Sequence, residues 1–358
     1  MTEPSWTAHP GSPETPPPRG PVSEAVLAAL HRSPGRVAIP RLDDVDMLDD
    51  DDAQLALTCC YELHYRGFAG VDPDWEWAPA LLEVRSRLER RFEARLLDEV
   101  PGSGTAGPAD ARDVLLELAS GDDRGSLSSW MVERGTRCEM REFLVHRSVY
   151  QLKEADPHTW AIPRVRGGAK AAMALIQYDE YGAGDADEVH AELFSTTMRS
   201  LGLDPTYGAY LDLVPGPTLA TANVVSLFGL HRRWRAACVG HLALFEMTSV
   251  GPMGRYARAL AGLGVAAPGR RFYDVHVVAD TVHEGVALNT MVPALLDEEP
   301  HLAPDVIFGA RAATLLEQRF SGRLLAAWRA DTTSLRRPLP ATARTAELTR
   351  VYIAAGSV

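Results

Sequence analysis

The chain has 358 residues, of which 46% are hydrophobic and 23% charged, and its formal net charge is −12. This acidic balance argues against nucleic acid or an anionic membrane as the main partner, because both would repel it. The four cysteines include no C-x-x-C pair, which argues against thiolate zinc and thiol redox sites. With neither a signal peptide nor an apolar run of about 18 residues, the expectation is a cytoplasmic protein that binds a small molecule.

The N-terminal part of the chain divides into a tail and a helical region. Residues 1–20 are rich in Pro, Ser, Thr and Glu and lack periodic apolar residues, so they predict a disordered tail. Residues 21–137 are expected to be a helical N-terminal region that begins with VSEAVLAALHR. We interpret the acidic run at 42–52 as a solvated loop that caps the helix starting near Ala53, because the alternating ligands of a calcium loop are missing.

Apolar residues recur with helical periodicity along most of the remaining chain. Helices are expected at 53–66, 78–97, 109–120, 138–155, 168–182, 186–202, 218–231, 234–247, 252–264, 270–298 and 303–330. Pro and Gly mark the breaks between them, as in LVPGPT. No series of alternating residues predicts a sheet. The sequence therefore predicts an all-α protein with a helical bundle at 138–331 and a C-terminal extension at 332–358.

The predicted bundle carries more carboxylates and imidazoles on apolar helices than a structural core explains. In YDVHVVADTVHEG, the side chains of His276, Asp280 and His283 fall within an arc of roughly 60° on one helical face. Other helices of the bundle add Glu154, Glu180, His190 and Glu246. Buried acids are costly unless they are paired or bind a metal, and carboxylates with imidazoles suit iron or manganese. These residues are therefore candidate metal ligands.

Two of these assignments depend on local structure that the sequence leaves open. Glu180 and His190 are ten positions apart, which is about 80° out of register on an ideal helix. They can converge only if the two glycines of GAG at 182–184 bend or interrupt the helix. Glu154 lies near a predicted helix end beside Lys153, and it could equally be a surface acid.

Several neighbouring residues have structural interpretations. His241 is expected to be a core residue or to support the ligands, and Asp187 to face solvent, although Asp187 and His190 form an imperfect counterpart of an E-x-x-H pair. Arg164 and Arg166 precede a Gly pair. They could clamp a substrate carboxylate or be ordinary surface arginines.

The combined pattern resembles a known family. E-Y-G-x-G starting at Glu180, His190 followed by L-F, and then H-x-x-x-D-x-x-H on one helix resemble the iron-containing redox enzymes with a haem-oxygenase-like fold, the haem-oxygenase-like di-iron oxidases and oxygenases. The resemblance covers residues 138–330. It implies two iron ions, dioxygen as co-substrate and an external electron donor. It also implies that the iron ligands are Glu180, His190, Glu246, His276, Asp280 and His283.

Members of this family divide by reaction. Some oxygenate the nitrogen of amines or guanidines, and these carry one further carboxylate on the first core helix, where Glu154 stands. The resemblance thus favours N-oxygenation of an amine or amino-acid-derived substrate in a bacterial specialised-metabolite pathway. One alternative is desaturation or oxidative C–C cleavage of an amino or fatty acid. Another is a haem-binding protein on the same fold, which needs only one axial His. A homodimer through the N-terminal helices is a further expectation.

Overall fold

The computed structural model describes residues 11–42, 45–101, 104–121 and 124–340. These residues form helices and connecting turns, without a β-strand in the described part of the chain, so the all-α prediction is confirmed. The α-helices are α1 (Pro21–Leu30), α2 (Asp51–Glu62), α3 (Pro79–Glu99), α4 (Pro108–Ala119), α5 (Leu127–Glu133), α6 (Arg137–Gln151), α7 (Asp156–Thr159), α8 (Gly167–Glu180), α9 (His190–Ser200), α10 (Gly216–Leu230), α11 (Arg235–Thr248), α12 (Val250–Gly262), α13 (Ala267–Val286), α14 (Val292–Glu298) and α15 (Ala303–Arg329).

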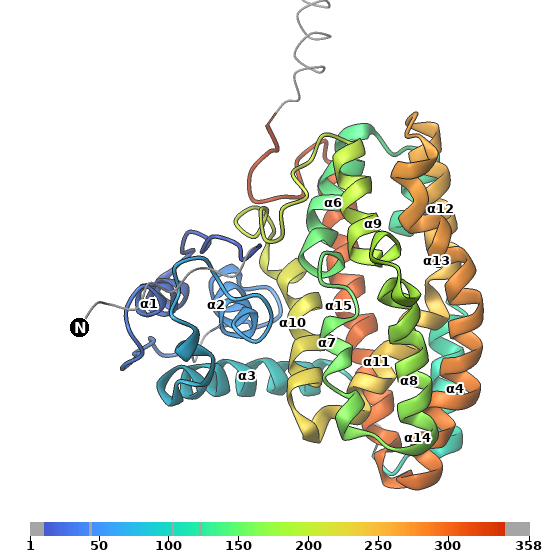
Figure 1. Cartoon of the computed structure of the whole chain (residues 1–358), viewed down its shortest axis with the longest axis horizontal. Coiled ribbons are helices and arrows are strands. Elements are labelled where there is room, and N and C mark those ends of the chain that lie inside the picture. Colours follow the sequence, from blue (N-terminus) through green and yellow to red (C-terminus); the bar gives the residue numbers. More distant parts are fainter. Residues whose placement is uncertain (1–10, 43–44, 102–103, 122–123, 341–358) are drawn as a thin grey trace, which may run out of the picture.

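The helices are arranged as a bundle with a smaller lobe at its side (Figure 1). The lobe consists of α1, α2 and α3, and α10 lies between the lobe and the rest of the bundle, packed against both α2 and α15. The acidic run does the capping expected of it. Asp50 accepts a hydrogen bond from Ala53 N at 2.7 Å, and the Asp52 carboxylate accepts from Val22 N and Ser23 N at the start of α1.

Only part of the predicted N-terminal tail and of the predicted C-terminal extension lies within the described residues. Residues 1–10 and 341–358 lie outside the described residues. Residues 11–20 are not a disordered tail, because Pro13 and Pro16 are buried and Pro13 O accepts a hydrogen bond from Ala69 N at 2.8 Å. At the other end, residues 332–340 return to the bundle, where Ser334 and Leu335 are buried. Packed proline rings therefore order a segment whose composition is typical of disorder.

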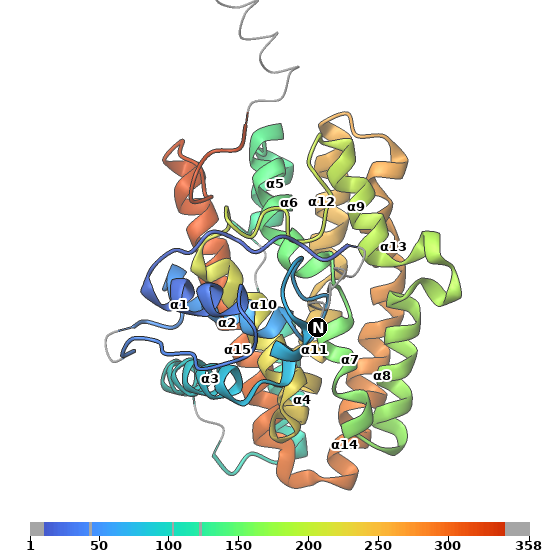
Figure 2. The same cartoon turned by 60° about the vertical axis from the view of Figure 1, so that its left-hand side comes forward.

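The helical N-terminal region contributes to the bundle as well as to the lobe. Helix α4 packs against α11 and α15, and α5 packs against α12 (Figure 2). Arg112 on α4 donates to Leu288 O at 3.0 Å. The region predicted as 21–137 therefore divides in space between α3 and α4.

Most predicted helices occur within a few residues of their expected positions, and the exceptions have local causes. The helix expected at 186–202 begins only at His190, because 3-10 turns occupy Gly182–Gly184 and Ala186–Glu188. The helix expected at 270–298 contains a π segment at Ala287–Met291, just before Pro293 removes a backbone donor. Short helices α5 and α7 are too brief to show a period.

Helices α11 and α15 cross in direct backbone contact at the centre of the bundle. A Cβ at Gly309 would lie 2.6 Å from Ala237 Cα, and a Cβ at Gly240 would meet the backbone of Val306. Each of these glycines therefore lies against the backbone of the other helix. Since α11 also carries Glu246, this close approach fixes one wall of the site described below.

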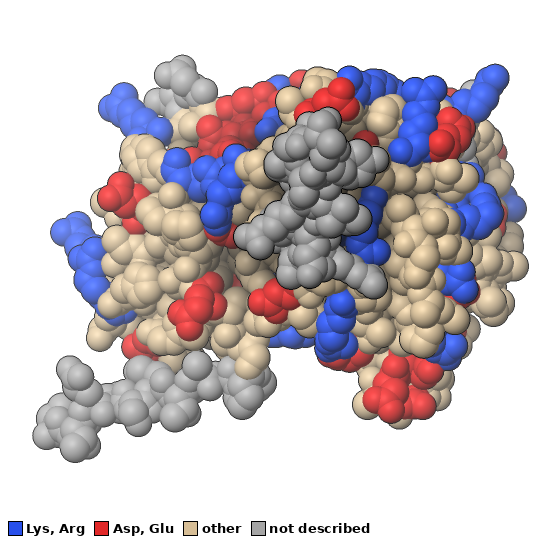
Figure 3. All heavy atoms as spheres, turned by 90° about the horizontal axis from the view of Figure 1, so that it is seen from above, with Lys and Arg blue, Asp and Glu red and all other residues tan. Residues whose placement is uncertain are grey.

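On the face seen in Figure 3, acidic and basic side chains are interspersed over the tan surface that surrounds the grey atoms. None of the helices in the described part of the chain has the length and apolar character needed to cross a membrane.

Candidate metal centre

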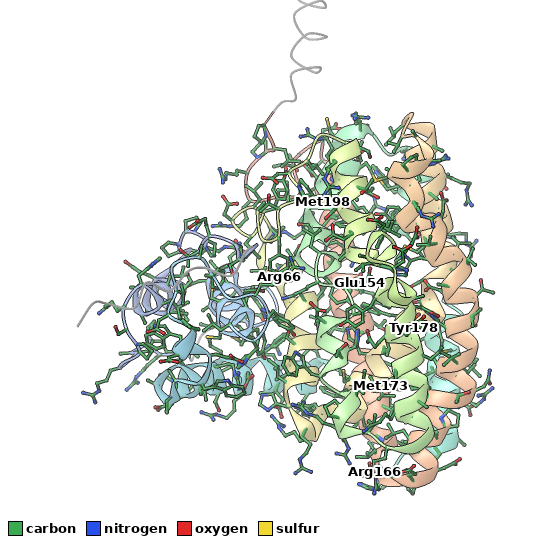
Figure 4. All side chains as sticks on the ribbon, in the orientation of Figure 1. Arg66, Glu154, Arg166, Met173, Tyr178 and Met198 are labelled. Carbon is green, nitrogen blue, oxygen red and sulfur yellow. The ribbon has the colours of Figure 1, made fainter. Side chains whose placement is uncertain are left out.

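The structure brings all seven predicted ligands together in the interior of the bundle. They come from the turn after α6 (Glu154), the last residue of α8 (Glu180), the first residue of α9 (His190), α11 (Glu246) and one face of α13 (His276, Asp280, His283). Figure 4 shows Glu154 about midway along the bundle. Six of the seven are buried, and Glu154 is partly buried. The predicted helical face of α13 is therefore directed inward.

The break between α8 and α9 is what lets Glu180 and His190 meet. Gly182 and Gly184 adopt φ values of 76° and 94°, and Ala183 between them has φ 51°. A Cβ on Gly182 would lie 2.6 Å from Val189 N, so this tight turn needs glycine. The turn places His190 Nδ1 at 2.8 Å from Glu180 Oε2. The interruption that the sequence required at GAG is thus present.

One group of possible ligands consists of Glu154, Glu180, His190 and His276. Each offers one atom, and these atoms lie within 4.8 Å of one another. His276 Nδ1 donates to Phe272 O at 2.7 Å. Its Nε2 is therefore free to face the carboxylates, at 3.6 Å from Glu154 Oε2 and 3.9 Å from Glu180 Oε2.

A second group shares Glu180 with the first and adds Asp280 and His283, again with atoms within 4.8 Å of one another. His283 Nδ1 lies 3.1 Å from Glu246 Oε2 and 3.7 Å from Asp280 Oδ1. Its Nε2 is 3.0 Å from Asp179 Oδ2, a contact that orients the ring from outside the cluster. Asp179 is not among the residues predicted from the sequence, where its only signal is its position beside Glu180.

Glu154 reaches the cluster through an unusual turn. Ala155 has φ 75°, a backbone conformation that costs a non-glycine residue about 1–3 kcal/mol. The neighbouring Lys153 points elsewhere, since its Nζ is 3.3 Å from Glu62 Oε2 in a buried ion pair. Glu154 is therefore not a surface acid paired with Lys153, and its Oε2 is buried.

Burial and mutual attraction shift the pKa values of the clustered side chains. Burial raises the pKa of Glu180 to about 8 and that of Glu246 to about 7. Burial also lowers the pKa of His190 to about 4. For His276 and His283 burial acts in the same direction, but the surrounding carboxylates outweigh it and raise their pKa values to about 10 and about 11. His276 and His283 thus carry positive charge beside the buried carboxylates, whereas His190 is neutral at pH 7.

The donor set fits iron. Glu154 Oε2 and Asp280 Oδ2 are buried without any hydrogen-bond partner, and an unpaired buried carboxylate oxygen is costly. A cation would satisfy both oxygens. Carboxylates and imidazoles without thiolate are the ligands typical of non-haem iron, and inward carboxylates and histidines on facing helices hold two irons in other bundles.

A cavity of about 370 Å³ opens beside the cluster. Glu154, Glu180, Glu246, His276 and Asp280 form one part of its wall. Aromatic side chains form much of the rest: Phe143, Tyr150, Phe245, Tyr256 and Tyr273. Arg147 and Glu317 also line it, joined by two hydrogen bonds of 2.8 Å. The cluster thus faces a space large enough for a small organic molecule.

Of the two interpretations of Arg164 and Arg166, a substrate clamp and ordinary surface arginines, the structure does not support the clamp. Arg164 donates to the carbonyls of Gly229 and Leu230 and so caps the end of α10. Arg166 is exposed and lies 3.6 Å from Glu298, at the lower end of the bundle in Figure 4, away from Glu154. Neither arginine lines the cavity.

The two remaining interpretations agree with the structure. Asp187 is exposed. His241 is buried, with Nδ1 at 3.0 Å from His158 Nε2, so it belongs to the core beside the cavity and not to the cluster.

Comparison with known proteins now assigns this site to a family. A profile of the family described as iron-containing redox enzyme matches residues 141–318, which include all seven clustered residues. The chain belongs to the iron-containing redox enzyme family. The family's helical fold confirms the haem-oxygenase-like bundle predicted from the sequence.

This family member is also similar to a curated protein, the nitrosourea synthase of Streptomyces achromogenes subsp. streptozoticus. The two are 25% identical over 230 residues, which is 63% of this chain. The chain spans about half the length of that relative, since the matched region covers 49% of it.

Proposed function

We propose that this protein is a non-haem di-iron oxygenase that transfers one oxygen atom of dioxygen to the nitrogen of an amine or amino-acid-derived substrate, in a bacterial specialised-metabolite pathway. The observation that carries this proposal is the pair of carboxylate–imidazole groups that share Glu180 and line one cavity. Membership of an iron-containing redox family supports the metal. The similarity to a protein named for a nitrosourea, which contains an oxidised nitrogen, supports the site of oxidation.

Each group of ligands would hold one ion. Glu154, Glu180, His190 and His276 would hold the first, and Glu180, Asp280 and His283, with Glu246 beside them, the second. The two irons would supply the activation of dioxygen, for an overall reaction R–NH2 + O2 + 2 e− + 2 H+ → R–NHOH + H2O. The two electrons would come from an external reductant, and the proposal specifies this donor only by that class.

The protein's own side chains have two tasks in this scheme. Phe272 O and Asp179 hold the rings of His276 and His283 in fixed orientations, so that Nε2 of the first and Nδ1 of the second face the carboxylates. The aromatic walls exclude water and lower the pKa of a bound amine, because burial disfavours the ammonium form. A substrate nitrogen therefore enters with its lone pair available.

The proposal is tested by turnover of the iron-loaded protein. Protein loaded anaerobically with Fe(II) is mixed with dioxygen, a chemical reductant and a panel of amines, guanidines, amino acids and fatty acids, and the products are analysed by mass spectrometry. We expect a gain of one oxygen atom on nitrogen, lost in Glu154→Ala and retained in Glu192→Gln, an exposed acid on α9.

Other products would replace the proposal. Loss of a carbon fragment or of two hydrogens from an amino or fatty acid would indicate oxidative cleavage or desaturation at the same centre. Failure to form any oxygen-dependent product, together with a Soret band on addition of haem, would indicate a haem-binding protein.

A further inference from the structure

Two glutamines stand just before two of the proposed iron ligands. Gln151 is three residues before Glu154, and Gln177 is three residues before Glu180. Both line the cavity, and both are buried, with exposed fractions of 8% and 3%. Neither amide atom of Gln177 has a hydrogen-bond partner, and neither does Gln151 Oε1.

Unpartnered buried amides require an explanation, because nearly all buried polar groups in folded proteins are hydrogen-bonded. Arg147 and Tyr150, which also line the cavity, have partners. Arg147 is held by Glu317, and the Tyr150 hydroxyl lies 3.4 Å from His158 Nδ1. Among the described residues of the wall, the buried side-chain atoms without a partner belong to the two glutamines and to the cluster residues Glu154 and Asp280. The cluster oxygens are accounted for by iron, but the amides are not.

We propose that Gln151 and Gln177 bind the substrate and determine its chemical class. A primary amide offers an N–H donor beside a carbonyl acceptor, and this holds whichever way the side chain is turned. Its complement is a planar group with an N–H next to an acceptor: a urea, an amidine or a neutral guanidine. This inference deepens the proposed function, because the group would occupy the same cavity.

The charges around the glutamines disfavour an anionic group. Both side chains are uncharged, and the guanidinium of Arg147 is already neutralised by the Glu317 carboxylate. A free carboxylate would therefore find no unpaired positive charge there, and its desolvation would go uncompensated.

The position of Gln177 also suits delivery of a nitrogen to the cluster. It lies on the same helix as Glu180, so the two residues are separated by about 4.5 Å along the axis and share one side of α8. A nitrogen hydrogen-bonded to Gln177 would therefore be held close to ions bound by Glu180. Gln151, at the end of α6, approaches the cavity from a second helix.

The test measures binding to the metal-free protein. The probe is n-butylurea, and its dissociation constant is determined by isothermal titration calorimetry for wild type, Gln177→Leu and Gln151→Leu, with n-pentanol as an apolar probe of similar length. We expect Gln177→Leu to raise the dissociation constant of n-butylurea about tenfold or more, because two hydrogen bonds are lost. Gln151→Leu should have a smaller effect. Glu192→Leu, at an exposed residue of α9 that does not line this cavity, is the control and should have none.

A second readout separates substrate binding from a structural role. Replacing an unpartnered buried amide by Leu should leave the melting temperature of the metal-free protein unchanged or higher, whereas a structural amide would lower it. If Gln177→Leu does not fold, Gln177→Glu, which keeps the shape but loses the donor, should weaken n-butylurea in the same way. Equal affinities in wild type and the Gln177 variants, or wild-type binding of n-butylurea no tighter than of n-pentanol, would overturn the inference. Because no iron is present, failure of the di-iron proposal does not affect this result.

Discussion

The contact between α11 and α15 gives a sharp prediction, because α15 contains two glycines with opposite surroundings. A Cβ at Gly309 would lie 2.6 Å from both Cα and C of Ala237, and separations under 3.0 Å are essentially never seen for real Cβ atoms. Gly322, on the exposed side of the same helix, has nothing within 4 Å of its Cβ position. In helix propensity alone, Gly→Ala stabilises either position by about 1 kcal/mol.

The two substitutions should therefore have opposite signs. Gly322→Ala should raise the free energy of unfolding by up to about 1 kcal/mol. Gly309→Ala should lower it by about 1–3 kcal/mol, because the obstructing atoms belong to backbone and the helices must separate. Urea unfolding followed by far-UV circular dichroism measures both values. Equal stability of the two variants would refute the close crossing and, with it, the wall that positions Glu246.

Three further predictions concern the buried polar groups. Burial lowers the pKa of His146 to about 3, so below pH about 6.5 the unfolded chain binds a proton that the folded chain does not. Between pH 7 and pH 5, the free energy of unfolding should therefore fall by about 2 kcal/mol more in wild type than in His146→Gln. Equal pH dependence of the two proteins in denaturant titrations would contradict this. Glu62→Ala leaves the Lys153 ammonium buried and unpaired and should lower the free energy of unfolding by about 3–5 kcal/mol. Adding Lys153→Met should restore much of this loss. If chemical unfolding shows no recovery in the double variant, the ion pair does not contribute as described. Asp179→Asn weakens the contact between residue 179 and His283 Nε2. It should lower the iron affinity, measured by chelator competition, about 10–100-fold with little change in melting temperature. Unchanged iron affinity would show that this contact does not support metal binding.

Much of the fold and of the candidate site could be predicted because the relevant signals are local. The i, i+4, i+7 spacing of His276, Asp280 and His283 defines one side of a helix whatever the helix packs against. The two glycines between Glu180 and His190 likewise mark a break by their backbone freedom. Both features occur in the structure as expected.

What could not be predicted depends on contacts between segments far apart in the chain. The fate of Lys153 was open because its partner Glu62 lies 91 residues away. Gln151 and Gln177 are ordinary helical residues in the sequence, and only the structure shows that they line a cavity, with Gln151 Oε1 and both amide atoms of Gln177 lacking partners. Arg164 looked available because the carbonyls that it caps belong to a different helix.

The most direct test of the central claim is the iron content of the Glu180→Gln variant. Glu180 is the residue shared by the two ligand groups, so its loss should affect both ions. Metal-free protein is loaded anaerobically with Fe(II), freed of excess metal and analysed for iron, with Glu192→Gln as control. We expect about two irons per chain in wild type and control and a loss of both in Glu180→Gln. Wild-type protein that retains no iron, or a Glu180→Gln variant that retains as much as wild type, would contradict it.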